Sequence, residues 1–317
     1  MKSTSTGASP LAIWTALVAV WIVWGSTYLA IRFAVETIPP FLMAGTRFLF
    51  AGGVLYIWRV LAGDQKPEKV EWRSAAIVGS LMLLGANGGV SWAEQYVVSS
   101  VAALLVALAP MWMVVIDGLV PGGRKPNRWA VLGVVVGFGG VVLLVGPSQL
   151  TGLHGDVDPI GAGVLVLASF LWASGSLYNR GAQLPKSPLL GTGMQMLVGG
   201  AGLILLGTLS GEWGRLDIST ITMQSVWGLV YLIVFGSWVG FVAYIWVLRA
   251  APTPLVSTYA YVNPLVAITV GSLIGSEPVT TRLLLAAAII VSSVAIITIT
   301  QPIRRKGNKK VTTVVRP

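Results

Sequence analysis

Apolar stretches of about 20 residues recur along the whole chain, and each is long enough to cross a bilayer as a helix. Hydrophobic residues make up 55% of the sequence and charged residues only 10%, whereas a soluble domain carries about 25% charged residues. Within lipid, every backbone polar group must be satisfied inside the protein. We therefore predict an all-α integral membrane protein with ten transmembrane helices. The predicted spans are residues 11–32, 41–61, 73–92, 97–119, 128–146, 159–178, 188–209, 224–248, 253–274 and 280–301.

The two halves of the chain resemble each other in sequence. Residues 24–53 match residues 172–201 at an offset of 148, and residues 99–128 match residues 253–282 at an offset of 154. Each half holds five spans, an odd number, so the second copy must cross the membrane in the opposite direction. We predict two inverted five-helix repeats, 11–146 and 159–301, around a central cavity, followed by a basic tail at 302–317. Such repeats place a binding site near the midplane between the halves.

The basic residues predict the orientation in the membrane. If the N-terminus lies in the cytoplasm, most Lys and Arg residues fall in loops on that side, and only Arg32, Arg215 and Arg282 fall in loops on the other. This is the positive-inside pattern, and it places both termini in the cytoplasm. The net charge of +10 lies in short loops and the tail, so we expect no nucleic-acid partner. The expected partners are the lipid bilayer and a small-molecule substrate, and a homodimer is left open.

Several kinds of chemistry find no support in the sequence. The chain has no cysteine, and its single histidine, His154, lies in a predicted loop beside Asp156 and Asp158; we expect neither a metal site nor a cofactor. No phosphate-binding loop motif is present. An intramembrane transferase would need clustered acids or histidines near one interface, so we expect no enzyme. Asp117, Glu94 and Glu277 lie toward span ends, which disfavours a proton-coupled exporter of cations with a mid-membrane carboxylate.

Arg47 is the one strong charge well inside a predicted span. Because a charge in the membrane centre is costly, Arg47 should face a cavity or a partner. It falls on Gln195 in the second half, which indicates that both positions face the protein interior. Arg47 would either bind a substrate carboxylate or pair with Glu94 and so fasten spans two and three; the sequence leaves both open.

Aromatic and polar side chains in the spans are further candidates for substrate contacts. Trp24 and Tyr28 share one helical face, and Trp172 and Ser176 lie at the matching positions of the second half. For the two tryptophans, cavity lining and simple packing are equally open, whereas Trp14, Trp58, Trp72, Trp129 and Trp213 fit an interfacial aromatic belt. Asn87 in span three and Tyr259, Tyr261 and Asn263 in span nine complete the candidate set with Gln195.

Prolines and glycines predict where helices bend and pack. Pro110 and Pro264 occupy matching positions and would each bend a helix beside the centre, with or without a ligand contact. Gly133, Gly137 and Gly140 in span five are typical of a helix-packing face.

Together these residues resemble a known family. Trp24-Gly25-Ser26-Thr27-Tyr28, Ala44-Gly45-Thr46-Arg47-Phe48, Tyr259-Ala260-Tyr261-Val262-Asn263-Pro264 and Gly275-Ser276-Glu277-Pro278 look like the EamA-type exporters of the drug/metabolite transporter superfamily. The resemblance covers about residues 11–301. It departs from the family at Gly123, which stands where the second repeat has Glu277 and where many relatives carry an acid in both copies.

The resemblance implies a ten-helix carrier in a bacterial-type inner (plasma) membrane, with helices five and ten packed away from the cavity. It also implies secondary transport, and we expect export of small, amino-acid-like metabolites by alternating access. Among the other functions considered, a drug or toxic-cation exporter of the same fold comes first, and a passive channel or an intramembrane transferase is less favoured. Glu94, Pro110, Pro264 and Glu277 are the expected structural or gating residues.

Overall fold

A computed structural model describes residues 9–120, 125–146, 157–251, 253–256 and 258–300. Every regular element in these ranges is a helix. Within the described residues, nine helical segments are long and apolar enough to cross a membrane, and Tyr259–Leu273 is a shorter apolar helix. Observed and predicted spans agree to within a few residues because length and hydropathy define both. The predictions about His154, Gly123 and the tail at 302–317 lie outside the described residues.

Some crossings are single helices and others are chains of shorter ones. In the first half the helices are α1 (Pro10–Val35), α2 (Pro40–Leu61), α3 (Lys69–Gly79), η1 (Ser80–Asn87), α4 (Gly88–Ala93), α5 (Ser99–Val106), α6 (Ala109–Leu119) and α7 (Arg128–Val145). In the second half they are α9 (Pro159–Asn179), α10 (Pro188–Leu209), η2 (Glu212–Gly214), η3 (Ile218–Thr220), α11 (Met223–Tyr231), η4 (Leu232–Val239), α12 (Gly240–Ala250), α13 (Thr253–Val256), α14 (Tyr259–Leu273) and α15 (Thr281–Thr300).

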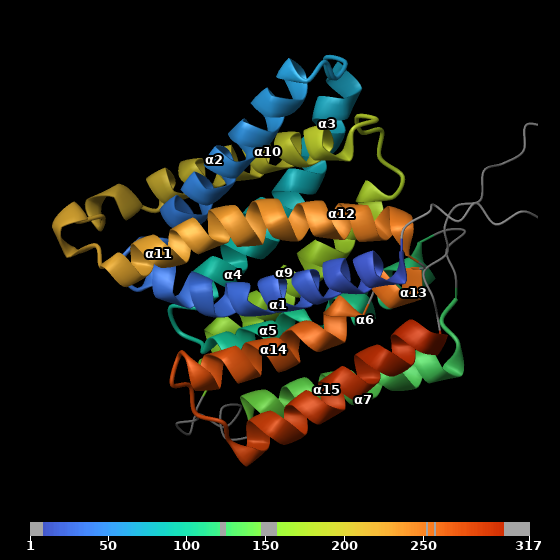
Figure 1. Cartoon of the computed structure of the whole chain (residues 1–317). Helices are drawn as coiled ribbons and strands as arrows, with labels where there is room; N and C mark the ends of the chain where they lie inside the picture. Colours follow the sequence, from blue (N-terminus) through green and yellow to red (C-terminus); the bar gives the residue numbers. More distant parts are fainter. Residues whose placement is uncertain (1–8, 121–124, 147–156, 252, 257, 301–317) are drawn as a thin grey trace, which may run out of the picture.

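Repeat-matched helices pack in antiparallel pairs. α2 lies along α10, and α7 lies along α15 at the opposite side of the bundle (Figure 1). In the first pair, Gly52 meets Gly193 while Gly45 meets Ile204, so one helix ascends as the other descends. In the second pair, Gly133, Gly137 and Gly140 face α15, which confirms the predicted packing face. Antiparallel mates are what an inverted repeat requires of these two helix pairs.

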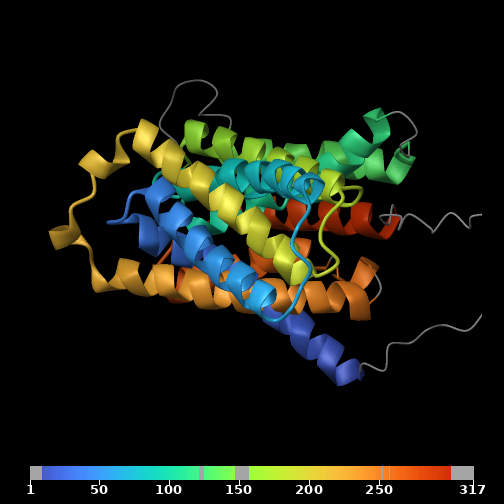
Figure 2. The same cartoon turned by 90° about the horizontal axis from the view of Figure 1, so that it is seen from above.

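Helix contacts in one half have counterparts in the other. α1 packs against the α11–η4–α12 crossing and against α14, and α9 packs against the α3–η1–α4 crossing and against α5 and α6. α2 also touches η4, as α10 touches α3 and η1. The view in Figure 2 shows α2 and α10 crossing one face of the bundle. The α2–α10 and α7–α15 pairs therefore flank a centre built from α1, α9 and the crossings that contact them.

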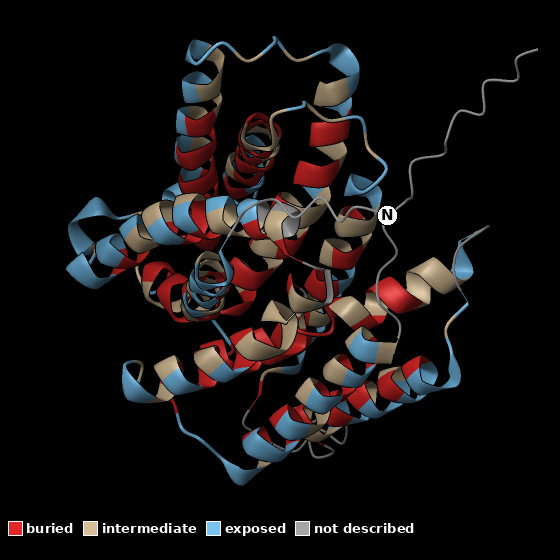
Figure 3. Ribbon diagram, turned by 45° about the vertical axis from the view of Figure 1, so that its right-hand side comes forward, coloured by how far each residue is buried: buried red, intermediate tan, exposed pale blue. Residues whose placement is uncertain are grey.

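The outer faces of the helices carry exposed apolar side chains, and the buried residues face inward (Figure 3). Trp14, Trp58, Trp129 and Trp213 are among the exposed ones, each close to a helix end. An apolar exterior ringed by tryptophans fits a bilayer surface with interfacial belts. The chain is therefore embedded in the membrane and crosses it repeatedly.

The matched prolines do not behave alike. The fourth crossing is broken between α5 and α6, and Pro110 lies in the first turn of α6. The ninth crossing is interrupted earlier, between α13 and α14, and α14 continues through Pro264. Pro110 therefore starts a helix whereas Pro264 is accommodated inside one, and the bend expected at each proline stays a prediction.

Candidate functional site

An aromatic cluster occupies the seam between α1, α12 and α14. The Trp24 ring lies 5.4 Å from the Phe241 ring, 4.9 Å from the Tyr244 ring and 5.5 Å from the Tyr259 ring, measured between centroids. Gly240 leaves the space that the Trp24 indole fills, because a side chain at that position would collide with its Nε1. Edge-on and tilted contacts of this kind are typical of stable aromatic packing.

The cluster extends to the other half through one phenol. Tyr259 is within hydrogen-bonding reach of both Trp172 and Tyr244. Trp24 and Trp172, which the repeat equates, therefore both contact Tyr259. All three were candidates from the sequence, and the structure brings them together between the halves. Tyr244 and Phe241 were not singled out, because nothing in an apolar span marks one aromatic residue as facing inward.

Arg47, on α2, lies beside this cluster, next to η4 and to the part of α1 around Thr27. The residue is only 5% exposed, and its Nε donates to Ser237 Oγ at 3.0 Å. Gly236 and Thr27 close over the guanidinium. The alternative in which Arg47 pairs with Glu94 is wrong, since no salt bridge within the described residues joins them and Glu94 has no hydrogen-bond partner there. Arg47 is thus a buried cation whose contacts are the Ser237 hydroxyl and the ring of Phe48, 4.7 Å from the guanidinium carbon to the ring centroid, with no carboxylate partner among the described residues.

Arg47 and the aromatic cluster are about one helical turn apart. Thr27 packs at Gly236 beside Arg47, and its Oγ1 donates to the Trp24 carbonyl at 2.6 Å. On the facing crossing, Gly236 touches Arg47 and Gly240 touches Trp24. A ligand between them could place an anionic group at Arg47 and an apolar group on the aromatic rings.

The facing crossing is wound as a π-helix beside Arg47. η4 covers Leu232–Val239, and the equivalent third crossing of the first half carries its own eight-residue π-helix, η1. Trp238 Nε1 in η4 donates to the Ala51 carbonyl at 3.2 Å and so binds this segment to α2. π-helical turns within α-helices frequently occur at functional sites, and no sequence pattern indicates them here.

The remaining candidates are spread around the bundle. Gln195 Nε2 is 3.4 Å from Asn179 Oδ1, and the Gln195 backbone packs on Gly79 of α3. Asn87 donates to the Met82 carbonyl of its own π-helix at 3.1 Å. Of the other candidates, Asn263 on α14 is buried. Tyr28 on α1, Ser176 on α9 and Tyr261 on α14 are partly buried. These residues are not gathered around Arg47, and their substrate-binding role stays a prediction.

Glu277 links the two halves at one end of the bundle, which we call the Glu277 end. Its carboxylate accepts from Arg32 Nη1 at 2.8 Å and from the backbone N–H groups of Ser99 and Ser100 at 2.8 and 3.1 Å. Burial opposes ionisation of this carboxyl, but hydrogen bonds from Ser100 and Ser99 outweigh it and hold the pKa of Glu277 below its usual range. The carboxylate therefore caps the start of α5.

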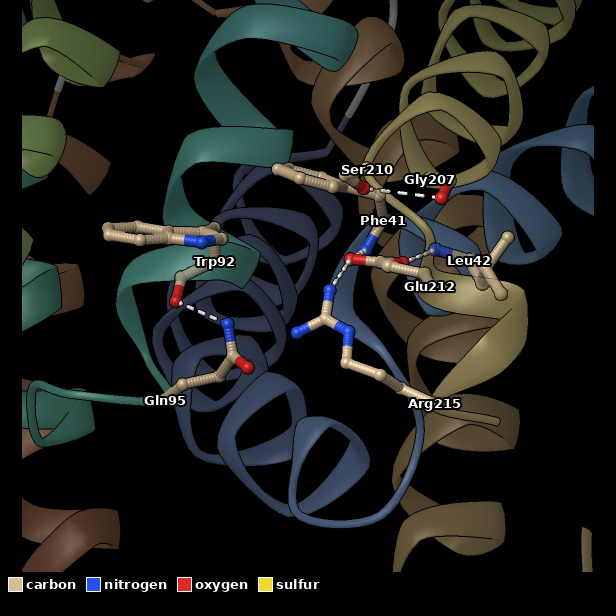
Figure 4. A network of polar contacts seen from close by, with 8 residues as sticks. All are labelled: Phe41, Leu42, Trp92, Gln95, Gly207, Ser210, Glu212 and Arg215. Atoms are coloured by element: carbon tan, nitrogen blue, oxygen red, sulfur yellow. Dashed lines mark hydrogen bonds and ion pairs between the residues drawn. The ribbon is translucent and has the colours of Figure 1, made fainter. Parts of the chain in front are cut away.

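Two other acids fasten α2 to α10. The fully buried Glu212 accepts from the Phe41 and Leu42 N–H groups at 3.2 and 2.9 Å and lies 3.6 Å from Arg215 (Figure 4). Asp64, at the same offset of 148 in the other half, binds Arg59 at 2.7 Å and also hydrogen-bonds Ser187 at the start of α10. Each acid follows one helix of the pair and binds the start of the other: Glu212 caps α2, whereas Asp64 contacts Ser187, the N-cap residue of α10. The offset could have revealed them, but their partners could not be read from the sequence.

Comparison with known proteins gives a consistent result. The sequence profile of the EamA-like transporter family matches residues 10–146 and 159–299. The "Uncharacterized inner membrane transporter YedA" of Escherichia coli is 34% identical over 91% of both chains. The "Uncharacterized transporter YoaV" of Bacillus subtilis is 26% identical over 86% of this chain and 92% of its own. A solved crystal structure superposes with a TM-score of 0.60 at 20% identity, covering 95% of this chain and 99% of the other, and so shares the fold.

Proposed function

Since this chain belongs to the EamA-like transporter family and is a membrane transporter, we propose that it exports small, amino-acid-like metabolites from the cytoplasm by alternating access. The observation that carries the substrate class is Arg47. Its guanidinium is buried and hydrogen-bonded to Ser237, and no salt bridge joins it to any carboxylate in the part of the chain that the structure describes. A buried charge without a counter-ion is costly, and a substrate carboxylate would supply the missing partner.

The aromatic cluster supports the second part of the substrate. Trp24, Tyr244 and Tyr259 offer apolar ring faces with phenol groups at their edges, about one turn from Arg47. Sites of this composition suit a small molecule that is charged at one end and apolar at the other. A cationic drug would meet the positive charge of Arg47 in the same seam, so this alternative is disfavoured.

The equivalent contacts of the two halves support alternating access. In the proposal, α1 with its partner crossings and α9 with its partner crossings move as matched units around the seam. Matched contacts and antiparallel mates are what such a rearrangement needs. We place both termini on the cytoplasmic side, following the distribution of basic residues in the loops.

Reconstituted protein tests the proposal through substrate counterflow. Liposomes preloaded with a mixture of amino acids should accumulate a labelled amino acid in a saturable manner, whereas a labelled cationic dye should not accumulate. Conductance that does not saturate would favour a channel. Failure of every carboxylate-bearing compound to exchange, with exchange of the dye, would contradict the proposed substrate class.

The Arg47→Gln variant tests the proposed carboxylate contact directly. Loss of a hydrogen-bonded charge pair should weaken apparent substrate affinity about 10- to 100-fold, whereas Arg47→Lys should retain part of it. Arg128→Gln, which removes an exposed arginine at the start of α7, should leave affinity unchanged. If Arg47→Gln lowers thermal stability but keeps wild-type affinity, Arg47 is a structural residue instead.

A further inference from the structure

The Glu277 end contains buried oxygen atoms that lack donors. Five buried side-chain atoms in the described residues have no hydrogen-bond partner, and four of them are Glu94 Oε1, Glu94 Oε2, Ser99 Oγ and Ser100 Oγ. Glu94 directly follows α4 and is 3% exposed; Ser99 and Ser100 begin α5 and are 0% and 1% exposed. A carboxylate buried without donors is unstable as an anion.

The charges around Glu94 do not balance when both acids are ionised. Glu277 faces it from the loop before α15, and Arg32 and Tyr28 face it from α1. The Arg32 guanidinium donates to Glu277 rather than to Glu94. Two carboxylates thus share one arginine, and the serine N–H groups are also taken by Glu277. One proton would make the cluster neutral.

The environments of the two acids push their acidities apart. Burial and then the nearby Glu277 charge raise the pKa of Glu94 well above its usual range. The pKa of Glu277 is lowered instead, because the hydrogen bonds that its carboxylate accepts outweigh the effect of its burial. Neighbouring carboxyl groups separated in this way commonly hold one proton between them, on the less solvated group.

We propose that Glu94 is a proton-binding site that keeps the Glu277 end closed. The Glu277 loop is the segment 274–280 between α14 and α15. A proton from water at this end adds to Glu94 Oε as α1 and the Glu277 loop close over it, and the proton returns to water when they separate. The proton then binds the closed state more tightly than the open state, in which the carboxyl is hydrated. This inference rests on the alternating access of the proposed function and adds the ligand that biases it.

The sign of the effect follows from that difference in affinity. Acidic solution at the Glu277 end favours the closed state, and raising the pH favours opening. Glu94→Gln, which imitates the protonated carboxyl, should stay closed at every pH. Glu36→Gln, which neutralises an exposed acid beyond the same end of α1, should retain the wild-type response.

Infrared spectroscopy of the substrate-free protein detects the proton itself. At neutral pH the wild-type protein should show the carbonyl band of a protonated carboxyl group, and the band should disappear as the pH is raised. Glu94→Gln should lack the band and Glu36→Gln should keep it. A wild-type spectrum without such a band at neutral pH, or a band that survives in Glu94→Gln, overturns the proposal.

Thiol labelling tests the link between the proton and opening. The chain has no cysteine, so Leu29→Cys introduces a single thiol at a buried position of α1 that contacts Gly275 in the Glu277 loop. Its labelling rate should rise more steeply with pH than that of the same cysteine in the Glu94→Gln background. Equal pH responses in the two backgrounds refute the switch, as does a response to sodium at constant pH in place of the response to protons. Neither measurement involves substrate, so their failure would leave the proposed export untouched.

Discussion

At the level of single residues, Arg47 differs from the three arginines that form ion pairs within the described residues. Arg32, Arg59 and Arg215 each lie within 4 Å of an acid near a helix end. Arg47, deeper in its helix, has a serine hydroxyl instead. An ion pair near a helix end contributes to holding the bundle together, whereas a cation buried beside a single hydroxyl leaves its charge uncompensated. This contrast is the reason why we propose that Arg47 binds a substrate carboxylate.

Asp64 gives a residue-level prediction for acidic pH. The hydrogen bonds from Arg59, and then from Ser187, hold the pKa of Asp64 below its usual range. A lowered pKa stabilises the folded state above the unfolded pKa of about 4, and this stabilisation is lost as the pH falls through the folded value. We expect the melting temperature in detergent to fall in that acid range and to fall less in Asp64→Asn. As a control, the melting temperature of the Glu36→Gln variant, which lacks an exposed acid, should fall as steeply as that of the wild type. The prediction is wrong if the melting temperature of Asp64→Asn also falls as steeply as that of the wild type.

At the level of helices, close contact between α2 and α10 depends on paired glycines. A Cβ at Gly52 would lie 2.9 Å from the Gly193 carbonyl oxygen, and one at Gly200 would lie 2.7 Å from the Leu49 nitrogen. These contacts are with backbone, which cannot move aside as a side chain does. The repeat matches Gly52 with Gly200 in the sequence, but the sequence does not show that the glycines of α2 face those of α10.

Gly52→Val should therefore separate the two helices. We expect a loss of about 1–3 kcal/mol in stability from overpacking, seen as a lower melting temperature. The matched control is Gly53→Val, because nothing lies within 4 Å of a Cβ at the neighbouring position. Equal effects of the two variants would mean that helix propensity, and not close packing, governs this pair.

The two halves differ in sequence at the positions that form the Glu277 contacts. Ser99 and Ser100, whose N–H groups bind Glu277, are matched by Thr253 and Pro254 in the second half, and Glu277 itself is matched by Gly123. Proline has no N–H group to be capped. At the matching positions of the repeat, both the acid and one of its two backbone N–H donors are therefore missing. We expect this carboxylate cap only at the Glu277 end.

At the level of the whole molecule, the antiparallel pairing of α7 with α15 places the starts of these two helices at opposite ends of the bundle. We expect Val279→Cys to react with a membrane-impermeant reagent applied to intact cells. Lys125→Cys should react only after the cells are permeabilised. Both positions are exposed, and no native cysteine competes. Labelling of both from one side would contradict the inverted topology.

Much of the architecture could be predicted from the sequence because it depends on local properties. Span lengths follow from hydropathy, and the packing face of α7 follows from the spacing of its glycines. The prolines show where such reasoning ends, since Pro110 begins a helix and Pro264 lies within one. Whether a proline breaks a helix depends on what its neighbours offer to the freed carbonyl, and a single span does not contain that information.

The sequence by itself determined that this chain is a membrane-embedded bundle of two related halves with a charge bias across it, because hydrophobicity, repetition and charge are written residue by residue. Only the tertiary structure decided that Arg47 meets Ser237, that Trp24 and Trp172 converge on Tyr259, and that Glu94 is left without a donor. Most of these contacts join residues more than 80 positions apart, and burial gives them their energetic weight. Hydrogen bonds and charges matter most where water is excluded, and only the packed fold determines where that is.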